Sequence, residues 1–333
     1  MSISEFNYEL PEHLIAQTAA EPRSAARLLI DNGNDAPGHS VVERIGEQLR
    51  SGDVVVVNNT KVLPARIHLF RSTGGRVEML LLEPLGDGEW ECLLRPGGKL
   101  RVGEQLYSPT GQPVVTVLGR RKSPSAATFA IAIHAAEQDL FQLGELPLPP
   151  YITQRPSDPN RYQTVFAHRP ASAAAPTAGL HFTNELIADL TNAGIRFLEV
   201  ELIVGIDTFR PVEAEQLDDH VMHTESYHVP QDVFDEAHEA RRVIAVGTTS
   251  TRALESAATR GQLSGRTDLF IRPGYEWKMV DLLMTNFHQP RTTLLVMIEA
   301  FVGRRWRELY QEAISQQYRM LSFGDAMLLN RHR

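Results

Sequence analysis

The pattern of apolar residues along this chain changes character near residue 66 and again after residue 146. Gly52 and Asp53 lead into four consecutive valines, residues 54–57, a run typical of a strand that is buried on both faces. Residues 66–135 instead carry short apolar segments (77–82, 90–94, 114–118 and 128–133) between turns rich in glycine and proline. Short strands at this spacing predict a small antiparallel barrel or sandwich.

After the stiff linker Leu-Pro-Leu-Pro-Pro at residues 146–150, helices and strands are predicted to alternate. Thr183 can cap a helix that ends before Gly194, and further helices are expected over 230–242 and 292–302. Strands are expected over 195–206, 243–246 and 282–287. We therefore predict an α/β main domain with a mixed, mostly parallel sheet (residues 1–65 and 148–333), interrupted by an inserted small antiparallel β-barrel domain (residues 66–147).

Composition excludes several classes of protein. Cys92 is the one cysteine among 333 residues, which rules out internal disulfides, cysteine-rich zinc sites and an iron–sulfur cluster held by several thiolates of this chain. No apolar run approaches the roughly 20 residues that cross a bilayer. The first ten residues lack a basic-then-apolar signal region. We expect a cytoplasmic protein without a membrane partner.

The net charge of -8 argues against a protein that coats nucleic acid indiscriminately. Local surfaces still act separately, because the Debye length at physiological salt is about 8 Å. Over residues 63–124, nine Lys and Arg stand against six Asp and Glu, and Arg304, Arg305 and Arg307 form a second basic group. Both groups favour the interpretation that one surface of the protein faces a polyanion. The alternative is that these charged residues are simply exposed to solvent.

Small hydroxyl residues, Gly-Thr-Thr-Ser-Thr at 247–251, follow the predicted strand 243–246. Such a turn directs backbone N–H groups and a helix dipole at one point, which predicts a pocket for a carboxylate or phosphate. Ordinary capping of the next helix is the alternative.

Three histidines lie in sequence contexts that suggest a catalytic or metal-binding role. His181 ends the run of small residues 175–180, which would let a ligand approach the backbone, and it is either catalytic or a structural donor. His220 and His223 have helical i, i+3 spacing beside Glu225. A metal would need a third ligand that the sequence does not specify, so we expect a solvated helix end or an acid–base role for His223 or Glu225.

Further polar residues follow two predicted strands. Asn286 and His288 come after one strand, and Arg210 follows another. Open α/β sheets place their ligands at the carboxyl ends of strands, where Arg210 could bind an anion or form a structural ion pair. The sequence contains no P-loop, no GxGxxG after a first strand, no HExxH and no GxSxG. These observations predict an α/β enzyme with an inserted β domain and an anion pocket.

Long segments of the chain, in order, also resemble one known family over nearly the whole length. It is the S-adenosylmethionine:tRNA ribosyltransferase-isomerase family of queuosine biosynthesis (the QueA family). The family pattern usually has Asn-Asp-Thr-Arg where this chain has Asn58-Asn59-Thr60-Lys61, and Gly-Ser where it has Ala171-Ser172. The matching segments are Tyr8-Glu-Leu-Pro-Glu-His-Leu-Ile-Ala-Gln17, Asn58-Asn-Thr-Lys-Val-Leu-Pro-Ala-Arg66, Leu146-Pro-Leu-Pro-Pro-Tyr-Ile152, Arg161-Tyr-Gln-Thr-Val165, Ala174-Ala-Pro-Thr-Ala-Gly-Leu-His-Phe-Thr183, Thr208-Phe-Arg-Pro-Val212, Met222-His-Thr-Glu225, Gly247-Thr-Thr-Ser250 and Thr285-Asn-Phe-His288.

The resemblance implies a reaction in which S-adenosylmethionine is a consumed co-substrate, with no true cofactor and no metal. Its ribosyl moiety would be transferred and isomerised onto 7-aminomethyl-7-deazaguanine, the wobble base of the tRNA. The products would be epoxyqueuosine-tRNA, adenine and methionine. The route would begin with loss of a proton from the carbon beside the sulfonium, and it needs a base, an acid for adenine and charge stabilisation.

On this chain the resemblance implies that His181, His223, Glu225 and His288 are catalytic. His181 would sit at adenine or the acceptor base, and His223 and Glu225 would transfer protons. Residues 247–251 and Arg210 would hold the methionine carboxylate or a tRNA phosphate. The inserted domain would grip the anticodon arm, and we expect a monomer. The expected substrate-binding residues are Thr177, Gly179, Arg210, Gly247, Thr248, Thr249, Ser250, Asn286, Lys61 and Arg66.

Two other classes of protein compete with this interpretation. A tRNA-binding relative without catalysis would have lost the histidine and hydroxyl motifs, which this chain retains. An ordinary S-adenosylmethionine methyltransferase would need a glycine-rich loop after its first strand, and the sequence has none.

Overall fold

The computed structural model of the chain describes residues 1–122, 127–134, 136–154, 156, 158–172, 174–205 and 212–332. It divides into two compact units. The first comprises Met1–Thr60, Pro149–Arg169 and Ala175–Arg333, and the second comprises Lys61–Leu148 and Pro170–Ala174. The second unit begins at Lys61 rather than at residue 66, and it includes a short segment that the sequence pattern did not assign to it.

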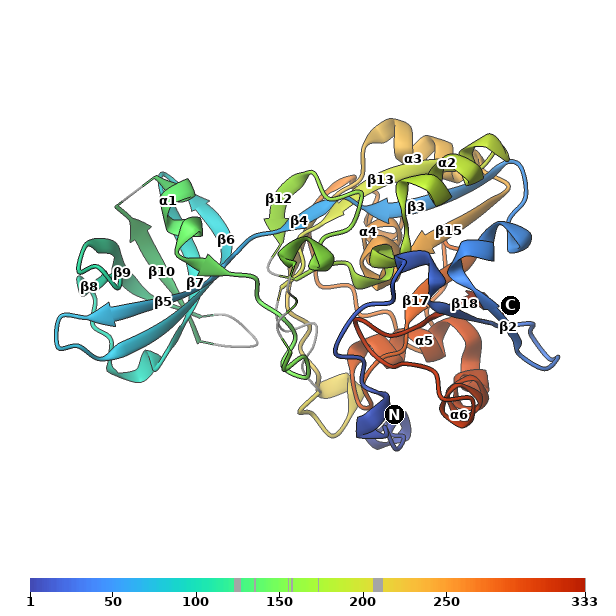
Figure 1. Cartoon of the computed structure of the whole chain (residues 1–333), viewed down its shortest axis with the longest axis horizontal. Coiled ribbons are helices and arrows are strands. Elements are labelled where there is room, and N and C mark those ends of the chain that lie inside the picture. Colours follow the sequence, from blue (N-terminus) through green and yellow to red (C-terminus); the bar gives the residue numbers. More distant parts are fainter. Residues whose placement is uncertain are drawn as a thin grey trace. The chain divides into compact units, whose positions relative to one another are not determined.

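A nine-stranded mixed sheet forms the centre of the first unit (Figure 1). The neighbouring strands β13, β3, β15 and β17 are parallel, and β1 is parallel to β18, while the other described pairs are antiparallel. This confirms the predicted α/β domain with a mixed sheet. The order is β16 (Ser264–Thr267), β14 (Glu225–His228), β13 (Arg196–Leu202), β3 (Asp53–Asn58), β15 (Arg242–Val246), β17 (Leu282–Asn286), β18 (Ala326–Asn330), β1 (Arg27–Ile30) and β2 (Gly38–Val41).

Helices cover both faces of this sheet. The valine run forms β3, whose six residues are all buried because alternate side chains meet helices on opposite faces. Val55 and Val57 share a core cluster with Leu186 and Leu190 of α2. Helix α4 contacts β13, β3, β15 and β17, and α5 contacts β18. The helices of this unit are α2 (Asn184–Asn192), α3 (Gln231–Glu239), α4 (Gly247–Arg260), α5 (Thr293–Val302) and α6 (Trp306–Ser315).

Local sequence signals set the ends of these helices. The Thr183 side chain accepts a hydrogen bond from the Leu186 amide, which starts α2, and Gly194 follows the helix with a φ of 82°, as predicted. Helix α4 begins at Gly247, so the predicted turn 247–251 is wrong: these residues form its first turn.

The second unit is a closed antiparallel barrel, which confirms the predicted inserted fold. Six strands follow one another around it in the order β5-β6-β7-β10-β9-β8, and pairing of Phe70 with Tyr107 joins the last strand to the first. Closure removes exposed strand edges. The elements are β5 (Arg66–Arg71), β6 (Arg76–Gly86), β7 (Glu89–Arg95), β8 (Gln105–Tyr107), β9 (Pro113–Lys122), β10 (Ala127–Ile133), α1 (Glu137–Gln142) and β11 (Gly144–Glu145), which extends the sheet beside β5.

Strands β4 (Thr60–Val62) and β12 (Arg169–Ser172) form a separate two-stranded sheet. Within the described part of the chain, no helix has the length and apolar character needed to span a bilayer.

Candidate functional site

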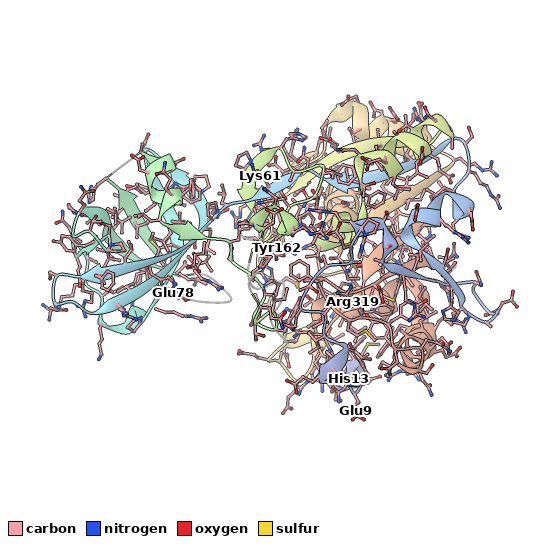
Figure 2. All side chains as sticks on the ribbon, viewed as in Figure 1. Glu9, His13, Lys61, Glu78, Tyr162 and Arg319 are labelled. Atoms are coloured by element: carbon pink, nitrogen blue, oxygen red, sulfur yellow. The ribbon has the colours of Figure 1, made fainter. Side chains whose placement is uncertain are left out.

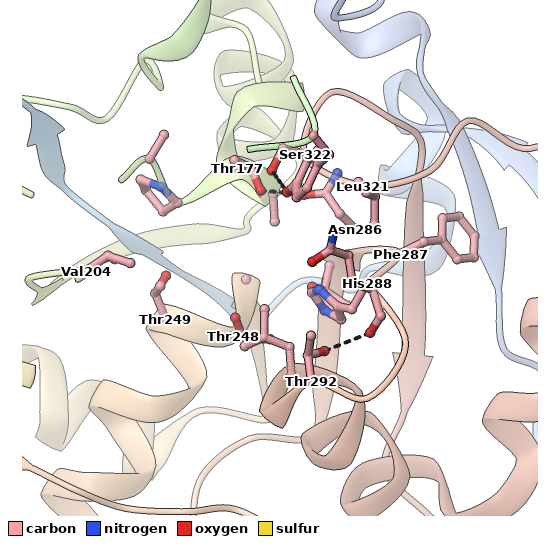
Figure 3. Close-up of a pocket in the computed structure, with 18 residues that line it drawn as sticks. Thr177, Val204, Thr248, Thr249, Asn286, Phe287, His288, Thr292, Leu321 and Ser322 are labelled. Atoms are coloured by element: carbon pink, nitrogen blue, oxygen red, sulfur yellow. Dashed lines mark hydrogen bonds between the residues drawn. The ribbon is translucent and has the colours of Figure 1, made fainter. Parts of the chain in front are cut away.

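Two adjoining cavities lie at one edge of the main sheet. Because β13, β15 and β17 run parallel within it, the residues that follow these strands meet at their carboxyl ends. The larger cavity encloses about 580 Å³, counting space that is open to solvent. Figure 3 shows the residues that line it. Its lining residues are Tyr151, Ala175, Pro176, Thr177, Ala178, Val204, Gly247, Thr248, Thr249, Thr285, Asn286, Phe287, His288, Gln289, Thr292, Leu294, Leu321 and Ser322.

Asn286, the last residue of β17, holds one wall of the larger cavity in place. Its Nδ2 donates to Nε2 of His181 at 3.1 Å and to the carbonyl oxygen of Asp325 at 3.3 Å. Its Oδ1 accepts from the hydroxyl of Thr177 at 2.9 Å. Both polar atoms of the amide therefore have partners, which fixes the orientation of this wall.

His181 lies behind this wall and lines neither of the two cavities. It ends the short 3₁₀ helix Thr177–His181, and its side chain is buried. Burial, together with the charge of Arg319, lowers the pKa of His181 to about 4. The imidazole is therefore neutral at pH 7, and the contact with Asn286 assigns its proton to Nδ1.

His288 lines the larger cavity directly. Its Nε2 lies 3.1 Å from the Thr285 hydroxyl. Its backbone is held from two sides, because its N–H donates to the Tyr310 hydroxyl at 2.9 Å and the Tyr8 hydroxyl donates to its carbonyl at 2.6 Å. Burial lowers the pKa of His288 to about 3, so this imidazole is also neutral at pH 7.

The hydroxyl residues at the start of α4 divide into two groups. The Ser250 hydroxyl donates to the carbonyl oxygen of Val246, the residue just before the helix, at 2.9 Å, and the Thr251 hydroxyl donates to that of Gly247 at 3.0 Å. Neither residue lines a cavity. Thr248 and Thr249 line both cavities, and Figure 3 shows them at the start of the helix, with Thr249 on the side of Val204. The sequence pattern predicted that all the hydroxyl residues of 247–251 would form the pocket. In the structure only Thr248 and Thr249 of these hydroxyl residues line the cavities.

The smaller cavity has a volume of about 420 Å³. It shares Thr248, Thr249 and Leu294 with the larger one, and its remaining wall combines a buried ion pair with apolar side chains. The other lining residues are Leu202, Met222, His223, Glu225, Arg252, Leu269, Phe270, Ile271, Thr293 and Met297.

Glu225 and Arg252 form the ion pair of the smaller cavity. Nη1 of Arg252 donates to Oε2 of Glu225 at 2.5 Å, and both side chains are more than nine-tenths buried. Burial alone would raise the pKa of Glu225, but the charge of Arg252, the nearby His223 and the amide of Gly205 outweigh it and lower the pKa to about 2. Glu225 is therefore an ionised carboxylate at neutral pH.

His223 lies beside this pair, with its Nε2 3.7 Å from Oε1 of Glu225. Residues 221–224 belong to no helix or strand, and β14 begins after them at Glu225. The predicted helix end is confirmed for His220, which caps the short 3₁₀ helix Leu217–Asp219. His223 lies beyond this helix, so the i, i+3 spacing does not place the two histidines on one helix face. His220 instead packs edge-on against Phe270, with ring centroids 5.5 Å apart.

The two predicted glycines have steric roles. Gly247 has a φ of 85°, which favours glycine, and an added Cβ would lie 3.5 Å from Cβ of Ala178. An added Cβ on Gly179 would lie 3.0 Å from Cγ2 of Thr164, tighter than ordinary contact. Gly247 lines the larger cavity, whereas Gly179 packs beneath its wall.

Of the remaining predicted site residues, the structure describes Lys61 and Arg66. Arg210 is outside the described residues. Lys61 and Arg66 belong to the second unit, so neither cavity is built from them; Lys61 is exposed on β4 (Figure 2), and Arg66 starts β5.

The second basic group is partly neutralised. Arg305 forms ion pairs with Glu308 and, at 3.6 Å, with Asp31. Arg307 is exposed, with its guanidinium 4.7 Å from the ring centre of Trp306, and Arg304 is exposed. Arg305 therefore does not contribute a free charge to this group.

Arg252 is a site residue that the sequence pattern did not reveal. It lies four residues after Thr248 and three after Thr249, and on a helix this spacing puts all three on one face. If residues 247–251 formed a turn, Arg252 would not be expected beside Thr248 and Thr249. Because the helix begins at Gly247, the three residues share one face. The described residues contain no cluster of three His, Cys, Asp or Glu side chains suited to a metal ion.

The chain is similar to known proteins over nearly its whole length. The family model described as queuosine biosynthesis protein matches residues 3–329. Relatives named S-adenosylmethionine:tRNA ribosyltransferase-isomerase include one from Carboxydothermus hydrogenoformans, 44% identical over 338 residues (99% of this chain, 100% of the relative), and one from Rubrobacter xylanophilus, 46% identical over 333 residues (99% and 98%). A crystal structure of S-adenosylmethionine tRNA ribosyltransferase from Thermotoga maritima matches with 36% identity and a TM-score of 0.56, covering 98% of this chain and 99% of that one. The chain therefore belongs to the queuosine biosynthesis family of S-adenosylmethionine:tRNA ribosyltransferase-isomerases, as its motifs predicted.

Proposed function

We propose that this protein transfers and isomerises the ribosyl moiety of S-adenosylmethionine onto 7-aminomethyl-7-deazaguanine at the wobble position of tRNA, releasing adenine and methionine and leaving epoxyqueuosine in the tRNA. The observation that carries the proposal is the similarity over 99% of the chain to relatives named for ribosyl transfer to tRNA. Because tRNA is the proposed substrate, we also propose that the protein works in the cytoplasm.

The paired cavities support this reaction. The larger cavity combines hydroxyl and amide groups of Thr177, Asn286 and Ser322 with apolar surface, a combination that suits the polar edge and the apolar faces of a nucleoside. We assign the adenosine part of S-adenosylmethionine to it. His288 lines this cavity and is proposed to contact the ligand, whereas His181 is a positioning residue that acts through Asn286.

Proton transfer is proposed to involve His223. An effective general base is a positioned group whose pKa lies near the working pH, and a carboxylate with a pKa of about 2 is too weak a base to take a proton from carbon. Glu225 is better suited to stabilise the imidazolium that His223 would form 3.7 Å away.

The basic residues of the barrel are proposed to bind the anticodon arm of the tRNA. Arg66, Arg120 and Arg121 lie on its strands, and Lys61 lies on β4. Replacing a phosphate-contacting residue by glutamine should weaken tRNA binding and lower the slope of log affinity against log salt by about 0.7–0.9 per lost contact.

Product analysis tests the proposed reaction. Purified protein is incubated with S-adenosylmethionine and tRNA that carries the 7-aminomethyl base, and the small molecules are separated by chromatography. We expect free adenine and methionine in equal amounts. S-Adenosylhomocysteine would instead show methylation, and the absence of both adenine and S-adenosylhomocysteine, with tRNA bound, would show a binding protein.

A further inference from the structure

The smaller cavity contains buried polar atoms that have no hydrogen-bond partner among the described residues. They are Oγ1 of Thr249 and Nε of Arg252. Nε2 of His223 also makes no hydrogen bond to a described residue, although it lies 3.7 Å from Oε1 of Glu225. Thr249 is 8% exposed and Arg252 6% exposed, so solvent does not readily satisfy them. A buried polar group without a partner costs about 1–3 kcal/mol, and native proteins rarely retain several in one place unless a ligand or water completes them.

The other bonds of Arg252 show which of its N–H groups remains for a ligand. Nη1 donates to Glu225, and Nη2 donates to the carbonyl oxygens of His223 and Thr267. The guanidinium is thus anchored by its far end, while Nε–H has no described partner. Thr249 lies three residues earlier on the same face of α4, so its hydroxyl and this N–H are placed to share one acceptor.

The charges and the apolar wall together define a class of ligand. Arg252 is a cation, and the ionised Glu225 is an anion, so the cavity presents both signs side by side. An α-amino acid head carries the same two charges, a carboxylate and an ammonium. The wall beyond the ion pair suits an unbranched chain that contains sulfur, because it is formed by Leu202, Met222, Leu269, Phe270, Ile271, Leu294 and Met297.

We propose that the smaller cavity binds the amino-acid end of S-adenosylmethionine, with the carboxylate at Thr249 and Arg252 and the ammonium at Glu225. This assignment rests on the proposed function. It places the sulfonium near Thr248 and Thr249, which line both cavities, and leaves the adenosine to the larger one. It gives Arg252 a binding role, and it gives Glu225 a second role, as partner of the ligand ammonium, beside its proposed stabilisation of His223.

A comparison of two ligands isolates this subsite. S-Adenosylmethionine has the amino-acid end, and 5′-methylthioadenosine lacks it but keeps the nucleoside and sulfur. Their dissociation constants are measured by calorimetry for wild type, Thr249→Val and Arg252→Lys. The matched control is Thr259→Val, an exposed threonine at the far end of the same helix whose hydroxyl contacts Tyr275.

We expect Thr249→Val to weaken S-adenosylmethionine binding about 10-fold and Arg252→Lys about 10- to 100-fold, the range for lost hydrogen bonds to a charged group. Binding of 5′-methylthioadenosine should stay within about twofold of wild type in both variants, and the control should change neither ligand. Thr249→Val preserves the shape of the side chain, so it remains informative if Arg252→Lys does not fold.

Three results would overturn the assignment. One is equal weakening of both ligands by Thr249→Val, and another is equal affinity of wild type for the two ligands. The third is unchanged S-adenosylmethionine binding with weakened binding of the substrate tRNA, which would give the cavity to the acceptor base. Adenine release by the wild type is recorded separately; if it occurs while the subsite test fails, the proposed function stands and the subsite does not.

Discussion

The two cavity walls differ in how far their polar groups are satisfied. Around the larger cavity, both polar atoms of Asn286 bond to Thr177, His181 and the Asp325 carbonyl. Arg252 of the smaller cavity, and Thr249, which lines both cavities, each keep a buried polar atom without a described hydrogen-bond partner. A satisfied network holds a shape, whereas an unsatisfied one lowers stability until a ligand completes it. The difference predicts which residues position the site and which would bind a ligand.

The largest expected effect comes from breaking the ion pair of the smaller cavity. Glu225→Ala leaves the Arg252 guanidinium buried without its anion, and it should lower the free energy of unfolding by about 3–5 kcal/mol in urea titrations. Glu225→Gln keeps the shape and one acceptor oxygen and should cost less. Equal costs for the two variants would show that the charge of Glu225 does not matter for stability.

Asn286→Ala tests the satisfied wall. It removes the partner of His181, Thr177 and the Asp325 carbonyl at once, and it should lower the free energy of unfolding by about 2–3 kcal/mol and slow adenine release. Thr177→Val removes one of these bonds and should cost about 1 kcal/mol. Urea titration of both variants gives the comparison, and a cost for Asn286→Ala no larger than that for Thr177→Val would contradict the network.

The buried histidines predict a pH dependence of stability. His181 and His288 stay neutral in the folded protein down to about pH 4 and 3, whereas an unfolded histidine takes up a proton near pH 6.5. The unfolded state therefore binds more protons below pH 6.5, and the free energy of unfolding should fall as the pH falls, by up to about 1.4 kcal/mol per pH unit for each histidine. Between pH 6 and 4, a stable His181→Asn variant should show a shallower slope than the wild type in urea titrations. An unchanged slope would mean that His181 is protonated in the folded state.

The smallest effect compares two neighbouring hydroxyls on α4. Ser250→Ala removes a hydroxyl bonded to its own helix and should cost up to about 1 kcal/mol. Thr249→Val removes a buried hydroxyl without a described partner, so the ligand-free protein should keep its stability within about 0.5 kcal/mol or gain a little. Thermal melts without ligand measure both, and a larger loss for Thr249→Val would mean that this hydroxyl already has a structural partner.

Much of the architecture follows from local patterns in the sequence. The valine run gave a central buried strand, and the glycine-separated segments 77–82, 90–94, 114–118 and 128–133 lie within strands of the barrel. Thr183 and Gly194 bound α2 because capping and left-handed backbone are properties of single residues. The wrong predictions concern residues whose structure depends on tertiary packing. Residues 247–251, rich in β-branched and hydroxyl side chains, form helix where they are buried. His223 lies outside any helix, between the short helix that ends at His220 and strand β14, which pairs with β13 and β16.

By itself the sequence determined the fold class, the family and the segments that carry polar chemistry, because hydrophobic period, caps and long motifs are readable in one dimension. Only the tertiary structure decided that His181 lies behind Asn286, that Arg252 pairs with Glu225, and that two cavities share Thr248 and Thr249. These relations join residues from different strands and helices, and burial then shifts their pKa values. No local pattern specifies which distant groups meet, since that depends on the order of strands in the sheet.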